Sequence, residues 1–281
     1  MPDATRHQPT AEDCARVKMA RVTVNGFSAF RHSKSANQQI GLQEEIDMKF
    51  SGHFKLIDIA CTEEQTASFA ELHQDQYHPD NSRFRRFSHF RLQYQNNAWL
   101  VERLPARPFV QAKQNNGLSG GVKRYFKPIL VDVSELILAG ARAALPDTDS
   151  SWLVSINQFR VVTTQSESGT PVPEGVHRDG EDMIFMVCAG RENVDGGVSK
   201  VYDDEMTEIF TGQLMPGQGM LVNDAISYHD ASRITLKPGK EFGYRDLFTI
   251  GYSDWNRGMY GAEFEIEHTG SEADLSLLTE D

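Results

Sequence analysis

The stretch that decides the fold is Val176-His177-Arg178-Asp179-Gly180, followed closely by the apolar run Met183-Ile184-Phe185-Met186-Val187-Cys188-Ala189. The apolar run is short, rich in residues that favour β-structure, and followed by glycines, so it predicts a buried strand. If this strand begins before His177, the alternation of side chains places His177 and Asp179 on one face and Arg178 on the other.

An imidazole and a carboxylate on one face are two ligands of a facial triad, in which two histidines and one carboxylate hold ferrous iron and leave coordination positions open. The third ligand must come from elsewhere in the chain. Downstream of Asp179 only His229 and His268 remain, and His268 lies in an acidic tail. His229 follows the strand-like residues 219–224, and a jelly roll can bring such distant strands together. We therefore predict His229 as the third ligand.

A second His-x-Asp pattern, His73-Gln74-Asp75, competes for the same role. The capping box Thr62-Glu63-Glu64-Gln65 predicts a helix start, and apolar residues continue beyond it at helical spacing. Residues two apart on a helix point about 200° apart around its axis. A helix over this stretch would keep His73 and Asp75 from binding one ion, so the sequence favours His177 and Asp179.

Arg245 is the candidate for binding an oxyacid. In Phe242-Gly243-Tyr244-Arg245-Asp246-Leu247-Phe248-Thr249-Ile250, alternation puts Arg245, Leu247 and Thr249 on one face. An arginine inside an apolar barrel needs an anion, and its planar guanidinium suits a carboxylate bidentately. The alternative is a surface salt bridge through Asp246 or another acid, but the upstream His177, Asp179 and His229 favour a ligand.

Composition excludes several classes of protein. The chain has 281 residues, 28 basic and 40 acidic, and a net charge of −12, which disfavours non-specific nucleic-acid binding. No apolar run is long enough to span a bilayer, and the polar N-terminus has no apolar signal segment, so no membrane association is expected. Three scattered cysteines form neither a CxxC motif nor a disulfide framework, which predicts a reducing, cytoplasmic location.

The chain divides into three predicted parts. Residues 1–45 form an N-terminal arm with a short strand at 21–24, residues 46–256 form the main domain, and residues 257–281 form a solvated acidic tail. Within the main domain we expect a helix over residues 128–144 and a short helix over 204–211. Many short strands punctuated by Gly and Pro predict a sandwich or jelly roll, mainly β with flanking helices.

Basic and aromatic residues interleave in Arg83-Phe84-Arg85-Arg86-Phe87-Ser88-His89-Phe90-Arg91-Leu92. One interpretation is a strand with a solvated basic face. The other is a set of arginines directed at an anionic small molecule.

Taken together, these patterns resemble the iron(II)/2-oxoglutarate dioxygenases, and within them the branch of free L-isoleucine 4-hydroxylase and related bacterial amino-acid hydroxylases. The resemblance runs from about residue 54 to residue 252. The stretches that carry it are residues 83–90, Asn157-Gln158-Phe159-Arg160, His177-Arg178-Asp179, Gly196-Gly197, His229 and Tyr244-Arg245-Asp246.

The resemblance implies a double-stranded β-helix core, with Fe(II) held by His177, Asp179 and His229 and 2-oxoglutarate held by Arg245. The implied reaction consumes dioxygen and 2-oxoglutarate and oxidises an unactivated C–H of a small aliphatic L-amino acid. Hydroxylation is the expected outcome, with desaturation or ring closure as variants. The chain departs from the family after the distal histidine, where Asp230-Ala231-Ser232-Arg233 replaces a small residue followed by Thr-Pro. This makes Arg233 a rival of Arg245.

A free amino acid needs a cation for its carboxylate and an acid for its ammonium group. The candidates for the first are Arg83, Arg85, Arg86 and Arg160, and those for the second are Glu181 and Asp182. Gln158 shares a face with Arg160 and is assigned to bind 2-oxoglutarate or the substrate. Whether the protein forms a homodimer stays open.

A cupin-like, metal-binding jelly roll without oxygenase activity, such as an isomerase or a sensor, is the main alternative, since fold alone does not decide function. Cupin sites usually add a third histidine or a glutamate to the ligand set, and no such ligand is assigned near His177. A purely structural or interaction role would leave the predicted His, Asp and Arg set unexplained.

Overall fold

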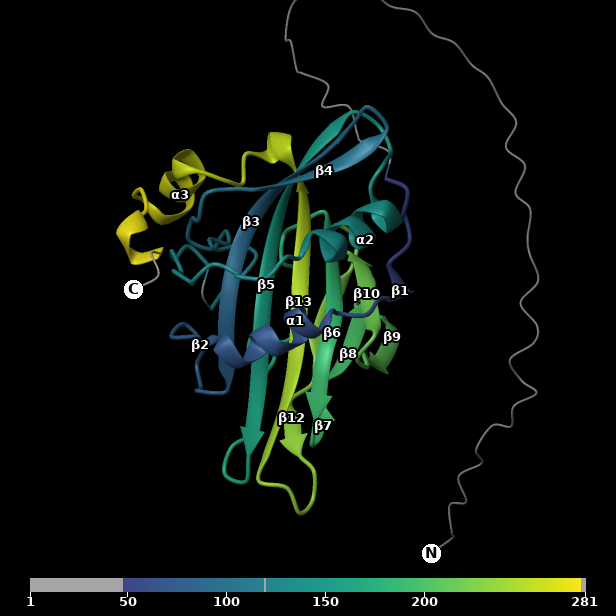
Figure 1. The fold of residues 1–281 in the computed structure, drawn as a ribbon, viewed down its shortest axis with the longest axis vertical. Helices are drawn as coiled ribbons and strands as arrows, with labels where there is room; N and C mark the ends of the chain where they lie inside the picture. Colours follow the sequence, from purple (N-terminus) through teal and green to yellow (C-terminus); the bar gives the residue numbers. More distant parts are fainter. Residues whose placement is uncertain (1–47, 119, 279–281) are drawn as a thin grey trace, which may run out of the picture. The chain divides into compact units, whose positions relative to one another are not determined.

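The protein is built mainly from antiparallel β-strands. The computed structural model describes residues 48–118 and 120–278. Its larger sheet has the strand order β1-β10-β6-β13-β5-β3-β2, with β4 paired to β3 (Figure 1). The strands of this sheet are β1 (Phe54–Asp58), β2 (His73–Gln74), β3 (Arg83–Gln95), β4 (Ala98–Arg103), β5 (Ser150–Thr164), β6 (Met183–Glu192), β10 (Gln218–Asn223) and β13 (Phe242–Asp254).

A smaller three-stranded sheet completes the jelly roll. It has the order β11-β8-β9, and a separate pair joins β12 to β7. Val201 of β8 packs with Met220 of β10 and Leu247 of β13, so apolar side chains fill the space between the two sheets. The predicted mainly β fold with a jelly-roll core is confirmed. The strands are β7 (Val194–Gly196), β8 (Val198–Tyr202), β9 (Glu208–Gln213), β11 (Tyr228–Ala231) and β12 (Ile234–Leu236).

Helices cover one face of the larger sheet (Figure 1). Leu136 and Ile137 of α2 (Ser134–Ala144) join the same buried cluster as Ile156 of β5 and Phe248 of β13. Before it, α1 (Glu63–Ala67) and the 3-10 helix η1 (Ser68–Glu71) follow the predicted capping box, whose reciprocal hydrogen bonds are both present.

Because side chains alternate along a strand, β3, β5 and β13 present two different faces. Their paired register puts Arg85 opposite Phe159, and Phe159 opposite Leu247. Odd-numbered residues in this part of the three strands face the smaller sheet, whereas even-numbered residues face the helices. This parity decides which polar residues reach the site described below.

Gly140 of α2 packs tightly against side chains of the larger sheet. A Cβ there would lie 2.3 Å from the hydroxyl oxygen of Tyr252, which itself donates a 2.7 Å hydrogen bond to the carbonyl of Ile137. We expect Gly140→Ala to lower the free energy of unfolding by about 1–3 kcal/mol through overpacking, although alanine favours a helix by about 1 kcal/mol. Urea unfolding would measure this loss. In a Tyr252→Phe background the loss should shrink, and an equal loss in both backgrounds would contradict the packing explanation.

Several predicted elements differ from the structure. The helix expected from residue 128 begins at Ser134, and the one expected over 204–211 is replaced by a turn and β9. The predicted acidic tail begins where the 3-10 helix η2 (Trp255–Arg257) ends. Up to residue 278 it contains the helix α3 (Ala262–Thr269) and the 3-10 helix η3 (Leu275–Leu278). The acidic composition predicted a solvated tail, but Glu265 of α3 is buried and pairs with Arg107 at 3.1 Å, a contact that composition does not reveal.

The predicted N-terminal arm, with its strand at 21–24, lies outside the described residues. Among the helices that are described, none combines the length and apolarity needed to cross a bilayer.

Candidate active site

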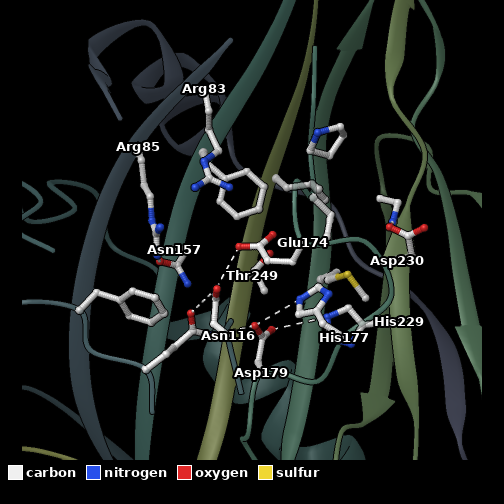
Figure 2. A pocket seen from close by; sticks show the side chains of 18 of the residues that line it. Arg83, Arg85, Asn116, Asn157, Glu174, His177, Asp179, His229, Asp230 and Thr249 are labelled. Atoms are coloured by element: carbon white, nitrogen blue, oxygen red, sulfur yellow. Dashed lines mark hydrogen bonds and ion pairs between the residues drawn. The ribbon is translucent and has the colours of Figure 1, made fainter. Parts of the chain in front are cut away.

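A cavity of about 100 Å³ lies between the odd-numbered face of the larger sheet and β11 of the smaller sheet (Figure 2). Arg245, Leu247 and Thr249 of β13 all line it, as the predicted alternation requires. The remaining lining residues are Arg83, Arg85, Phe109, Gln111, Asn116, Arg124, Asn157, Phe159, Pro171, Val172, Glu174, His177, Asp179, Met186, His229, Asp230 and Ala231.

His177, Asp179 and His229 meet at the floor of this cavity. One oxygen of Asp179 lies 3.5 Å from Nε2 of His177, and the other lies 3.5 Å from Nε2 of His229. All three ligand atoms lie within 4.8 Å of one another, the only such His, Cys, Asp or Glu cluster in residues 48–118 and 120–278. Two imidazoles and one carboxylate suit a ferrous ion, so the donor set fits the metal that the sequence predicts.

The histidines converge by a different route from the one expected. The strand does not begin before His177, because β6 starts at Met183. Instead, the backbones of His177 and His229 pair directly, with N–H to carbonyl distances of 3.0 and 2.9 Å. Nδ1 of His177 lies 2.9 Å from the carbonyl of Gly175, which leaves Nε2 for a ligand.

Asp224 holds the loop that carries Asp179. Its carboxylate accepts backbone N–H bonds from Asp179, Gly180 and Glu181 at 3.2, 2.7 and 3.1 Å. It also lies 3.5 Å from Nδ1 of His229. One buried carboxylate thus orients two of the three candidate ligands, a role that the sequence analysis missed although Asp224 directly follows β10.

The electrostatics of the triad favour a cation. Burial alone would lower the pKa of His229, but hydrogen bonds and charge from Asp179 and Asp224 outweigh it and raise the pKa to about 10. Burial opposes ionisation of Asp179, yet both histidines hold the pKa of its carboxyl well below the usual range. A divalent ion bound by the three side chains would meet the same need for positive charge beside the Asp179 carboxylate, and its binding would release protons from the imidazoles.

Arg245 is buried without a counter-ion. Only 2% of the residue is exposed, and burial lowers the pKa of its guanidinium to about 10. Nη2 donates a 3.4 Å bond to Ser199, and Nε has no hydrogen-bond partner. No carboxylate of the described chain forms an ion pair with Arg245, whereas Asp246 points to the helical face and pairs with Arg160. Arg233 is exposed and does not line the cavity.

Two of the candidate substrate-binding arginines line the cavity. Arg83 donates to Asp75 at 2.8 Å, and the same carboxylate oxygen lies 3.8 Å from Arg85. The Arg85 guanidinium lies over the rings of Phe109 and Phe126, 4.6 and 4.2 Å from their centroids. One carboxylate between two buried guanidiniums leaves a surplus positive charge at this end of the cavity.

The other candidates do not reach the cavity. Arg86, Gln158 and Arg160 carry even numbers and point to the helical face. There Arg86 donates to the carbonyl of Pro128, Gln158 donates to Ser68, and Arg160 forms a bidentate pair with Asp246 at 2.7 Å. Gln158 and Arg160 therefore share a face, as their alternation predicts, but that face points away from the cavity.

Glu181 and Asp182 also lie away from the cavity lining. Glu181 accepts from Ser155 and Ser253, and burial raises the pKa of its carboxyl to about 7. Asp182 pairs with Arg257 at 3.0 Å. The cavity carboxylate that the sequence analysis missed is Glu174, which accepts a 2.9 Å bond from Asn116 and has no ion-pair partner among the described residues.

The side chains of the competing pair, His73 and Asp75, are kept apart by their hydrogen-bond partners and not by a helix. The predicted helix over it is wrong, because α1 and η1 end at Glu71 and His73 begins β2. Asp75 is buried against Arg83, while the exposed His73 lies 3.2 Å from Arg86. His73 and Asp75 thus contact different arginines and do not form a metal-binding pair.

A β jelly roll with a His, Asp and His cluster in its cavity defines a class of metal-dependent oxygenases. A sequence model described as 2OG-Fe dioxygenase matches residues 66–251, well over half of the chain. The chain therefore belongs to the 2OG-Fe dioxygenase family and is a dioxygenase that uses Fe(II) and 2-oxoglutarate. This membership decides against the cupin-like alternative.

Solved structures agree with this fold. A bsmA homologue from Methylobium petroleophilum PM1 is 25% identical, with a TM-score of 0.59 over 68% of this chain and 80% of that one. IDO from Bacillus thuringiensis is 14% identical, with a TM-score of 0.54 over 68% of this chain and 84% of that one. Among curated proteins, a sequence search finds no match.

Proposed function

We propose that this dioxygenase oxidises an unactivated C–H of a small aliphatic L-amino acid, with hydroxylation as the main outcome. In this proposal His177, Asp179 and His229 hold Fe(II), and Arg245 binds the distal carboxylate of 2-oxoglutarate. Bound iron supplies the oxidising chemistry, in which 2-oxoglutarate and dioxygen yield succinate, carbon dioxide and the oxidised substrate. The protein residues bind and orient both organic molecules beside it.

The arrangement of charge in the cavity carries the substrate assignment. Arg83 and Arg85 share Asp75, so their surplus positive charge can bind a carboxylate. Glu174 also lines the cavity, forms no ion pair within the described residues, and can accept an ammonium group (Figure 2). A molecule with both groups, as in a free amino acid, would neutralise both ends.

The aliphatic part of the substrate has an apolar place to lie. Phe159, Val172, Met186 and Leu247 line the cavity together with the charged residues. These side chains exclude water from a hydrocarbon chain but offer it no hydrogen bond, which favours an aliphatic group over a polar one. The cavity volume of about 100 Å³ supports a small side chain such as that of isoleucine or leucine.

We expect purified protein with Fe(II) and 2-oxoglutarate to form succinate several times faster when an aliphatic L-amino acid is present. A panel of the twenty amino acids, followed for succinate and for substrate mass, would measure this. A gain of one oxygen indicates hydroxylation, and a loss of two hydrogens indicates desaturation or ring closure.

Glu174→Gln is the matched variant for the ammonium group. It should raise the KM for the amino acid by about 10–100-fold, the cost of a charge-assisted hydrogen bond. The Kd for 2-oxoglutarate should stay within about two-fold. No stimulation of succinate formation by any aliphatic amino acid would refute the proposed substrate class.

A further inference from the structure

A long segment without helix or strand reaches back to the triad. Between β4 and α2, the described residues 104–118 and 120–133 contain turns and one isolated backbone bridge, Phe109 to Arg124, but no helix or strand. Loops of this length inside a compact domain are usually functional, because ordering them is costly. This one places the buried side chain of Gln111 against Asp179, with Nε2 donating to a carboxylate oxygen at 3.1 Å.

The chemistry of its neighbours fixes the orientation of the Gln111 amide. Its carbonyl oxygen accepts from Nη2 of Arg124 at 2.6 Å and from Nδ2 of Asn116 at 3.2 Å. A guanidinium can only donate, so the amide oxygen must face Arg124. The NH2 group is thereby left to face Asp179, whose ionised carboxylate can only accept.

We propose that Gln111 is a positioning residue for Asp179. The inference rests on the proposed role of Asp179 as a ligand to Fe(II). Asp224 holds the backbone of residues 179–181. Apart from the two triad imidazoles, the described side chain that contacts the Asp179 carboxylate is Gln111. The Gln111 amide restrains rotation of that carboxylate, and the positive charge of Arg124 polarises the amide and strengthens the bond.

The same amide connects the metal site with the proposed substrate site. Asn116 donates both to Gln111 and to Glu174, the proposed acceptor of the substrate ammonium group. A continuous series of hydrogen bonds therefore runs from Glu174 through Asn116 and Gln111 to Asp179 (Figure 2 draws Glu174, Asn116 and Asp179). Outer partners of metal ligands in other proteins change metal affinity about 10–100-fold when they are replaced.

The test is a titration of metal-free protein with Co(II), which needs no dioxygen or 2-oxoglutarate. Gln111→Met keeps the length of the side chain but removes every hydrogen bond. We expect it to raise the Kd for Co(II) about 10–100-fold and to shift the visible absorption of the bound ion. Gln114→Met, at an exposed glutamine in the same loop, is the matched control and should stay within about two-fold.

The melting temperature of the metal-free protein separates positioning from folding. Gln111→Met should lower it more than Gln114→Met, because buried Arg124 and Asn116 lose an acceptor. Both variants should still melt cooperatively above the temperature of the titration, while their Co(II) affinities differ strongly. If Gln111→Met does not melt cooperatively, Gln111→Asn is titrated instead, and the same loss of affinity is expected because the shorter amide cannot reach both Arg124 and Asp179.

Asp179→Ala distinguishes the two levels of the proposal. Wild-type Co(II) affinity in a folded Gln111 variant, together with loss of Co(II) in Asp179→Ala, overturns the positioning role alone. Retention of Co(II) in Asp179→Ala overturns the proposed ligand set itself.

Discussion

Asp179→Ala is expected to abolish stoichiometric Fe(II) binding and to reduce 2-oxoglutarate turnover to background. The variant removes one of three ligand groups and leaves two imidazoles without the carboxylate between them. Because outer partners of a ligand already change metal affinity about 10–100-fold, the loss of a ligand should exceed about 100-fold. Anaerobic Fe(II) titration and succinate formation would measure the two losses separately.

The second His-x-Asp pattern provides the control. His73→Ala removes an exposed imidazole whose neighbour is Arg86, so Fe(II) stoichiometry and affinity should be unchanged. Asp75 is unsuitable for this purpose, because its loss would leave buried Arg83 and Arg85 without their carboxylate and cost about 3–5 kcal/mol of stability. Normal Fe(II) binding by Asp179→Ala, with loss in folded His73→Ala, would mean that the wrong pattern has been chosen.

Arg245→Met is expected to raise the Kd for 2-oxoglutarate about thirty-fold to a thousand-fold. The substitution removes a charge-assisted bidentate pair worth about 2–4 kcal/mol. Methionine keeps the apolar stem beside Leu247, and no proposed iron ligand is touched, so Fe(II) binding should survive. Titration of 2-oxoglutarate into the anaerobic Fe(II) protein, followed by charge-transfer absorption, would give the Kd.

Arg233→Ala is the matched control for the other arginine of this region. Its side chain is exposed, so the Kd for 2-oxoglutarate should change by less than about five-fold. The opposite ranking of the two variants would move the co-substrate site to Arg233.

The stability of Arg245→Met gives an independent check. A buried guanidinium without a counter-ion is costly to the folded protein, so its removal should leave the metal-free melting temperature unchanged or raise it. A large decrease would indicate that Arg245 has a structural role, and not mainly a ligand-binding one.

The sequence could predict the members of the triad and the β-rich class because these can be recognised from local patterns and from the resemblance to the dioxygenases. His177 and Asp179 precede an apolar run, and the position of His229 among strands separates it from His268. The alternation around Arg245 was also readable, since Leu247 and Thr249 are close in sequence. The route by which the triad assembles was not predictable in this way, because it depends on the long-range backbone pairing of His177 with His229.

The rest depended on contacts that local patterns do not specify. The side chains of Gln158 and Arg160 point away from the cavity because of the register of β5 against β13, in which Arg160 lies opposite Asp246. Glu174 and Gln111 lie in segments without periodicity, and their places follow from tertiary hydrogen bonds. The helix expected beyond Gln65 was overridden when His73 paired with Arg85 as part of β2.

The alternation along β3, β5 and β13 has a practical consequence for protein engineering. Asn157 lines the cavity but accepts a 3.0 Å hydrogen bond from Arg85. Three other positions on the odd-numbered face line the cavity without belonging to the triad or to its arginines, namely Phe159, Leu247 and Thr249. Their even-numbered neighbours pack against the helices and support the fold. A mutant library confined to these odd positions would therefore explore new substrates while leaving the helical layer unaltered.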